Sequence, residues 1–256
     1  MTADDDGNGR RPAAARDYRV VLLTVTSGAV NAVSFLALGK VFSSVVTGNL
    51  VLLGVAATTH SSAEALHAGL GIAGYAAGVL IAAPLAARGA HQAGTWPASV
   101  TTTLWVELVV LAAFCVGWEL SDGSPRDGGQ LALLIVAAAA MGMQSAAVRR
   151  LGQMSSTYLT STLLGVLAGP VTRTKPDGLG RSIGALAAVV AGALAGGILA
   201  KSAHAWLPIA VLVPVGVVVA ESMRDSGTAE LKCSPRRWRR RRAPSPGRTR
   251  WPGRRG

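Results

Sequence analysis

Apolar segments follow one another along the chain from residue 20 to residue 220. A membrane-spanning helix needs about 20 mostly apolar residues, and inside lipid the backbone must satisfy its own hydrogen bonds. We interpret four segments as complete spans: 66–87, 99–119, 182–200 and 205–220. The others form two pairs, each interrupted by a short polar break: 20–38 with 41–58, and 131–148 with 155–170. The pattern predicts an all-α polytopic membrane protein.

The positions of Lys and Arg indicate how many times the chain crosses, because cytoplasmic loops carry an excess of these residues. If every segment crossed, several of them would fall outside the cell: Lys40, Arg88, Arg149, Arg150 and Lys201. If each interrupted pair makes one net crossing, most lie inside: the N-terminal arginines, Arg88, Arg173, Lys175, Arg181 and the C-terminal arginines. We therefore predict six net crossings of the cell inner (plasma) membrane, with both termini cytoplasmic.

The order of the segments also indicates an internal repeat. An interrupted pair followed by two long spans occurs twice, in halves of about 20–120 and 130–221. Matching Asn31 with Gln144 places Thr47 on Thr160. Three net crossings in each half make the halves run in opposite directions. We predict an inverted repeat, a common plan among transporters.

Polar residues gather at the two breaks. The first break carries Thr47, Gly48 and Asn49 after two serines, and the second carries Thr160 and Thr162. We expect a short helix to begin at Leu50, with Ser, Thr and Asn capping its free N–H groups and Gly48 permitting unusual backbone angles or close approach. Two such helix starts, each with partial positive charge, would suit an anion or a polar solute.

The candidate substrate-binding residues are those of the two breaks and the two matched amides: Asn31, Thr47, Gly48, Asn49, Gln144, Thr160 and Thr162. The opposing interpretation is that the hydroxyl groups cap kinks or pack between helices, and that the amides form interhelical hydrogen bonds. For the hydroxyl groups, the pairing of the two clusters leaves these interpretations evenly balanced, whereas for the two amides interhelical hydrogen bonds are slightly favoured.

Glu107 lies near the middle of the long apolar segment 99–119. A carboxylate inside a membrane is costly unless it is paired, so such a residue is a functional candidate. Glu107 is our candidate coupling group, carrying a proton. The alternative is a structural ion pair with Arg149 or Arg150, or a glutamate that reaches the membrane interface.

The two ends of the chain are polar. Residues 1–19 are predicted to be a disordered cytoplasmic segment, and residues 20–221 the transmembrane domain. Residues 222–256 hold most of the net charge of +12 and are predicted to be a disordered cytoplasmic tail, since charge and Pro oppose a packed core. We expect its arginines to bind anionic lipid headgroups rather than nucleic acid, since no folded reading module accompanies them; a tail without a role is the other possibility.

No enzyme signature is found in the sequence. It lacks the nucleophile-elbow, zinc-protease, phosphate-loop and dinucleotide-binding motifs, and its two cysteines have no metal-ligand spacing. We expect no catalytic activity, cofactor or metal.

The stretch SGAVNAVSFLALGKVFSSVVTGNLVLLGVA resembles the signature of the YoaK family, a bacterial membrane-protein domain of unknown function. The second half is similar too, in MGMQSAAVRRLG and STYLTSTLLG. Asn31, Ser145 and Ser161 stand where Asp, Asn and Gly are common in the family. The resemblance covers most of residues 20–220 and implies a polytopic membrane protein, sometimes labelled a permease, without implying a substrate.

These observations favour a transporter or channel-like permease for an unknown small solute, with its site between paired helix starts. The alternative is a non-transporting membrane scaffold or regulator whose basic tail binds lipids or partners.

Overall fold

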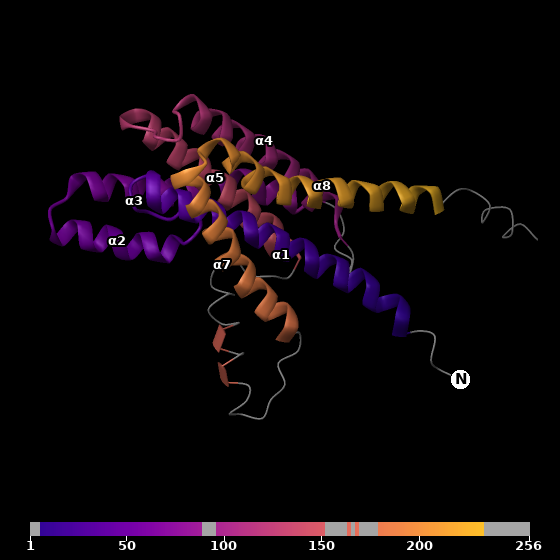
Figure 1. The fold of residues 1–256 in the computed structure, drawn as a ribbon. Helices are drawn as coiled ribbons and strands as arrows, with labels where there is room; N and C mark the ends of the chain where they lie inside the picture. Colours follow the sequence, from indigo (N-terminus) through magenta and orange to yellow (C-terminus); the bar gives the residue numbers. More distant parts are fainter. Residues whose placement is uncertain (1–5, 89–95, 152–162, 165–166, 169–178, 233–256) are drawn as a thin grey trace, which may run out of the picture.

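The computed structural model describes residues 6–88, 96–151, 163–164, 167–168 and 179–232, and within them the regular elements are helices (Figure 1). In chain order these are α1 (Asp6–Ala37), α2 (Val46–Thr58), α3 (Ser62–Ala86), α4 (Ala98–Leu120), α5 (Asp127–Arg150), α7 (Leu179–Ser202), the 3-10 turn η1 (His204–Trp206) and α8 (Leu207–Lys232).

In the part of the chain that the structure describes, six helices are long and apolar enough to cross a membrane: Asp17–Ala37, Ser62–Ala86, Ala98–Leu120, Asp127–Arg150, Ile183–Ser202 and His204–Asp225. The α2 helix is also apolar but has only 13 residues, about 20 Å at 1.5 Å per residue, which is too short for a span. The prediction of an all-α, multi-pass protein is confirmed for the described residues.

Contacts between side chains show the relative directions of the helices. Arg19 of α1 pairs with Asp225 of α8, and Thr26 Oγ1 donates to the Val211 carbonyl (3.3 Å), so α1 and α8 are antiparallel. Figure 1 shows the start of α1 and the end of α8 extending to the same side of the bundle.

The α3 and α5 helices run in parallel. At one end His67 lies 3.3 Å from Gln130, and at the other Arg150 donates to the Ala87 carbonyl (3.3 Å). Gln130 also donates to the Ala37 carbonyl at the end of α1 (2.8 Å). The bundle therefore has two ends, which we call the Arg19 face (Arg19, Ala87, Arg150 and Asp225) and the Gln130 face (Ala37, His67 and Gln130).

Two pairs of parallel helices, α1 with α7 and α3 with α5, pack most closely. Their contacts use glycines that are four residues apart on α3 and again on α7: Gly74 and Gly78, Gly192 and Gly196. They face backbone carbonyls with the same spacing: Ile135 and Ala139 of α5, Val25 and Ala29 of α1. A Cβ at any of these glycines would overlap the facing helix, so glycine is what lets the backbones approach.

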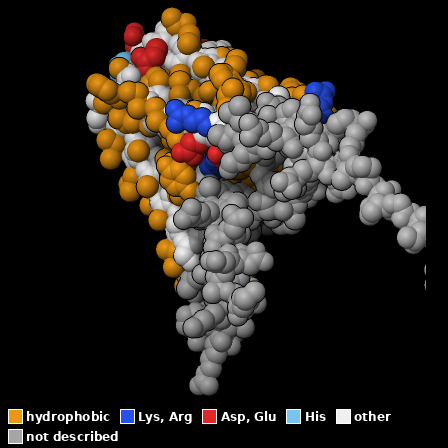
Figure 2. All heavy atoms as spheres, turned by 90° about the vertical axis from the view of Figure 1, so that its right-hand side faces the viewer, with side chains coloured by type: hydrophobic (Ala, Val, Ile, Leu, Met, Phe, Trp, Pro, Cys, Tyr) orange, Lys and Arg blue, Asp and Glu red, His pale blue; other side chains and the backbone are white. Residues whose placement is uncertain are grey.

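The core lies between α4, α5, α1 and α8, and its largest fully buried side chains include Trp118, Phe114, Leu111 and Met141. Large apolar side chains also cover the outside, among them Leu80, Val109, Leu194 and Ile198. On the face drawn in Figure 2, hydrophobic side chains cover most of the described part, and charged groups are confined to a few places. An apolar exterior of this kind is suited to contact with lipid.

Two helices extend past predicted boundaries, and a third prediction falls outside the described residues. The α1 helix begins at Asp6, inside the segment predicted to be disordered, because Ala13, Ala14 and Ala15 favour a helix. The α8 helix continues to Lys232, past the predicted end of the domain at 221. The second break, including Thr160 and Thr162, lies outside the described residues.

Candidate functional site

A return loop, residues 38–45, connects α1 to α2 and turns the chain back along α1. It begins with Gly39 and Lys40 at positive φ (99° and 58°). Gly39 is also required sterically, since a Cβ there would overlap the ring of His67. The loop brings Ser44 Oγ within 3.2 Å of Ser27 Oγ. Because Ser27 lies midway along the span Asp17–Ala37, irregular backbone reaches the middle of the membrane span.

Asn31 satisfies the polar groups of this loop. Its Oδ1 accepts hydrogen bonds from the backbone N–H of Ser44 (3.0 Å) and from Ser43 Oγ (3.2 Å). Its Nδ2 donates to Ser44 Oγ (2.6 Å) and to the Ser27 carbonyl (2.9 Å). Non-helical backbone at membrane depth is stable only where protein or water supplies such partners.

Asn49, in the first turn of α2, holds the other side of the loop. Its Oδ1 accepts from the Phe42 N–H (2.9 Å), and its Nδ2 donates to the Phe42 carbonyl (2.6 Å). On α3, a Cβ at Gly71 would lie 2.9 Å from that Nδ2, and a Cβ at Gly48 would lie 3.2 Å from the Phe42 ring. Gly48 and Gly71 therefore make room for the asparagine and the phenylalanine.

The predicted start of the short helix at Leu50 was wrong. The α2 helix begins at Val46, so Thr47, Gly48 and Asn49 are helical. Its N-cap, Val45, makes no side-chain capping bond, because valine has no side-chain oxygen that could accept one. The open backbone angles expected of Gly48 are likewise absent, since the glycines with positive φ in the described residues are Gly39 and Gly123. Thr47 is exposed.

Glu107 and Gln144 meet inside the bundle, on α4 and α5. Both side chains are buried, and Gln144 Nε2 donates to Glu107 Oε1 (2.9 Å). Glu107 Oε2 is buried and has no hydrogen-bond partner among the described residues. The suggested ion pair of Glu107 with Arg149 or Arg150 is therefore not the contact that the structure shows. The Glu107 carboxyl group bonds to the Gln144 amide, and Arg150 donates to the Ala87 carbonyl at the end of the bundle.

The sequence candidates thus separate into two groups. Asn31 and Asn49 support the return loop, and Gln144 joins Glu107 on another pair of helices. Among the residues that the structure describes, no group of three or more His, Cys, Asp or Glu side chains could hold a metal ion.

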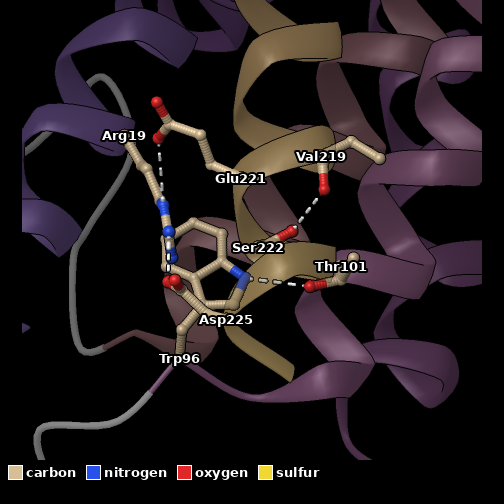
Figure 3. Close-up of polar contacts among 7 residues, drawn as sticks. All are labelled: Arg19, Trp96, Thr101, Val219, Glu221, Ser222 and Asp225. Carbon is tan, nitrogen blue, oxygen red and sulfur yellow. Dashed lines mark hydrogen bonds and ion pairs between the residues drawn. The ribbon is translucent and has the colours of Figure 1, made fainter. Parts of the chain in front are cut away.

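Sequence reasoning missed a charged cluster at the Arg19 face (Figure 3). Arg19 was assigned to the disordered N-terminal segment, yet its side chain is buried between α1, α8 and the residues preceding α4. It pairs with Asp225 and lies 3.6 Å from Glu221, and its guanidinium is 5.1 Å from the centre of the Trp96 ring. The sequence feature that could have indicated this cluster is the four-residue spacing of Glu221 and Asp225, which places both carboxylates on one helix face.

Comparison with known proteins gives two matches. The family model described as "Protein of unknown function (DUF1275)" matches residues 20–220. The UPF0700 transmembrane protein YoaK of Bacillus subtilis (strain 168) is 32% identical over 158 residues, which are 60% of this chain and 67% of that protein. No solved structure matches. The resemblance found in the sequence motifs is confirmed.

Proposed function

The chain belongs to the DUF1275 family, and from this premise we propose that it is an inner-membrane transporter or channel-like permease for a small solute. The observation that carries the proposal is the Glu107–Gln144 pair. A fully buried carboxyl group in the middle of a membrane span, with one oxygen that has no hydrogen-bond partner among the described residues, is costly to maintain for stability alone. We propose that Glu107 is the coupling group and that Gln144 orients it.

The helix packing supports a transporter plan with two inverted halves. The α1–α7 contact and the α3–α5 contact use the same device, two glycines four residues apart facing two carbonyls. If the first half (α1 to α4) is matched with the second half (α5 to α8), α1 corresponds to α5 and α3 to α7. The α1–α7 contact then corresponds to the α5–α3 contact. Because α1 and α5 run in opposite directions, this correspondence supports the proposed inverted relation between the halves, a plan common among transporters.

The distribution of cations supports the proposed orientation. The Arg19 face holds Arg19, Arg88, Arg149, Arg150 and Arg224, whereas the helix ends at the Gln130 face hold Lys40, Arg126 and Lys201. By the excess of Lys and Arg on cytoplasmic loops, the Arg19 face is cytoplasmic. Both termini then lie in the cytoplasm.

The solute is proposed to enter beside the return loop. The α2 helix starts at Val46 without a side-chain cap, at the depth of Ser27, which fits the proposed half-helix site. Because Asn31 and Asn49 already bond to the loop, we assign them to positioning it, and leave Thr160 and Thr162 as proposed lining residues.

The test is a stability screen on the purified protein followed by flux measurements. Amino acids, sugars and organic anions are added singly, and a ligand at 100 times its Kd should raise the free energy of unfolding by about 2.7 kcal/mol. Stabilising compounds are then tested for uptake into proteoliposomes with and without a proton gradient. Uptake that depends on the gradient in the natural protein and not in Glu107→Gln is the expected result.

The alternative function is a non-transporting scaffold or regulator whose arginine-rich tail binds anionic lipid. Here α8 leads directly from the bundle toward that tail, and each arginine near an anionic surface contributes about 1 kcal/mol. A chain ending at Lys232 separates the two functions. It should retain solute uptake if the protein is a transporter, and lose only its preference for phosphatidylserine-containing vesicles.

A further inference from the structure

We propose that the cluster around Arg19 is a latch that closes the Arg19 face, and that it opens when the two halves of the bundle separate there. The inference rests on the proposed transport function, since a transporter must open one face of the membrane at a time. It adds a gate that the coupling group Glu107 does not provide.

The latch joins the first half of the chain to the last helix (Figure 3). Arg19 comes from α1, and its two carboxylate partners, Glu221 and Asp225, come from α8. Trp96 precedes α4, stacks on the guanidinium, and donates from Nε1 to Thr101 Oγ1 of α4 (3.0 Å). Parting α1 from α8 at this face must break the ion pairs and uncover Arg19.

The exposure of the partners makes the latch reversible. The Arg19 side chain is 5% exposed, whereas those of Glu221 and Asp225 are 40% and 64% exposed. The carboxylates therefore keep much of their hydration when the pair breaks, and partly exposed ion pairs are weak. The guanidinium is held in the closed state by its partners and by the Trp96 ring, and it regains water only when the helices part.

The Gln130 face is closed differently. There Gln130 of α5 donates to the Ala37 carbonyl of α1 (2.8 Å) and lies 3.3 Å from His67 of α3. The Gln130–Ala37 hydrogen bond also connects the two halves, and the ion pairs found among the described residues lie at the Arg19 face instead. The Arg19 face is held by ion pairs and the Gln130 face by hydrogen bonds. Removing the charges of Glu221 and Asp225 should therefore let the helices part at the Arg19 face and not at the Gln130 face.

The experiment measures how fast single cysteines react with a membrane-impermeant maleimide in vesicles of each orientation. Cys115 and Cys233 are first replaced by Ser. One reporter is Leu23→Cys, a buried position one turn beyond Arg19 on α1; the other is Ala68→Cys, buried beside His67 at the opposite face.

The latch variant is Glu221→Gln with Asp225→Asn, and its matched control is Arg224→Gln, an exposed charge on the same turn. The variant should raise labelling of Leu23→Cys from the Arg19 face about fivefold, equivalent to about 1 kcal/mol, and leave Ala68→Cys unchanged. The control should change neither. Unchanged labelling of Leu23→Cys would overturn the latch, and so would a rise at both reporters, which would mean that the cluster only holds the bundle together.

A measurement without latch mutations covers the case in which the variant fails to fold. In the chain with its charges intact, raising the salt from 0.1 M to 1 M shortens the screening length from about 10 Å to about 3 Å, so Leu23→Cys should label faster and Ala68→Cys should not. A salt-independent rate would reject the latch. No solute is needed, so a protein that opens here yet moves no solute would retain the latch and disprove the proposed transport.

Discussion

Asn31 and Asn49 replace, at membrane depth, the water that hydrates loops in soluble proteins. Each side chain offers both an acceptor and a donor, and each uses both on the return loop. Glu107 has no such set of partners, since one of its oxygens bonds to Gln144 and the other is unpartnered among the described residues. The asparagines are therefore explained by structure, whereas Glu107 is not.

The first prediction concerns Asn49. Asn49→Ala leaves the N–H and the carbonyl of Phe42 without partners, and it should lower the free energy of unfolding by about 2 kcal/mol. Thr47→Ala, at the exposed neighbouring position, is the control and should have little effect. Thermal unfolding in detergent measures both, and equal stability of the two variants would contradict the role given to Asn49.

Glu107→Gln keeps the size of the side chain and removes its charge. An amide can still accept the hydrogen bond from Gln144, so the variant should fold with unchanged or higher stability, as expected when an uncompensated buried ionisable group is removed. Solute uptake should lose its dependence on the proton gradient, measured with a pH-sensitive dye inside proteoliposomes. If the variant misfolds, Glu107 is a structural partner and the coupling role fails.

Gly48→Val tests the start of α2. The added side chain would press on the Phe42 ring, because a Cβ alone would lie 3.2 Å away. We expect a loss of stability of about 1 kcal/mol, rather than the purely functional defect that a solute-facing glycine would give. Chemical denaturation measures the loss, and full stability combined with weakened ligand binding would instead place Gly48 at the solute site.

At the scale of elements, the bundle is built from two close parallel pairs and a short helix that cannot span. The α2 helix packs beside α3 and is connected to it by residues 59–61, so the pair of segments 20–38 and 41–58 makes one net crossing in this fold. Glycine spacing, rather than large apolar side chains, sets the approach of α3 to α5 and of α1 to α7.

Gly78→Ala should separate α3 from α5, because its methyl group would overlap the Ala139 carbonyl. We expect a loss of stability of about 2 kcal/mol or more, within the range for overpacked cores. Gly216→Ala on α8 is the matched control: nothing lies within 4 Å of its added Cβ, and a helical Gly→Ala change gains roughly 0.5–1 kcal/mol. Similar melting temperatures for the two variants would disprove the close contact.

At the scale of the whole molecule, the spans alternate in direction and place the start of α1 and the end of α8 at one face. That face carries the larger group of arginines, and the latch residues lie among them. We propose that this face is cytoplasmic, and the direction of the proposed transport and the side on which the latch opens both depend on that orientation.

Cysteine labelling tests the orientation. Cysteines near Ser62 and Gly123, which lie at the Gln130 face, should react with an impermeant reagent from outside intact cells. Those near positions 89 and 177 should react only after the membrane is made permeable. Labelling of Asp177→Cys from outside would rule out the six-crossing arrangement.

The fold class, four of the six long spans and the family follow from the sequence alone. Apolar length and the placement of Lys and Arg are local quantities, so they can be read without knowing which helices meet. It also marked Asn31, Asn49, Gln144 and Glu107 as exceptional, since amides and carboxyl groups are costly inside lipid. Their partners follow from the fold: Asn49 bonds to Phe42, Glu107 bonds to Gln144 rather than to an arginine, and Arg19 is buried against α8. Partners far apart in sequence are selected by helix packing, and the periodicity of one segment carries no information about the face of another.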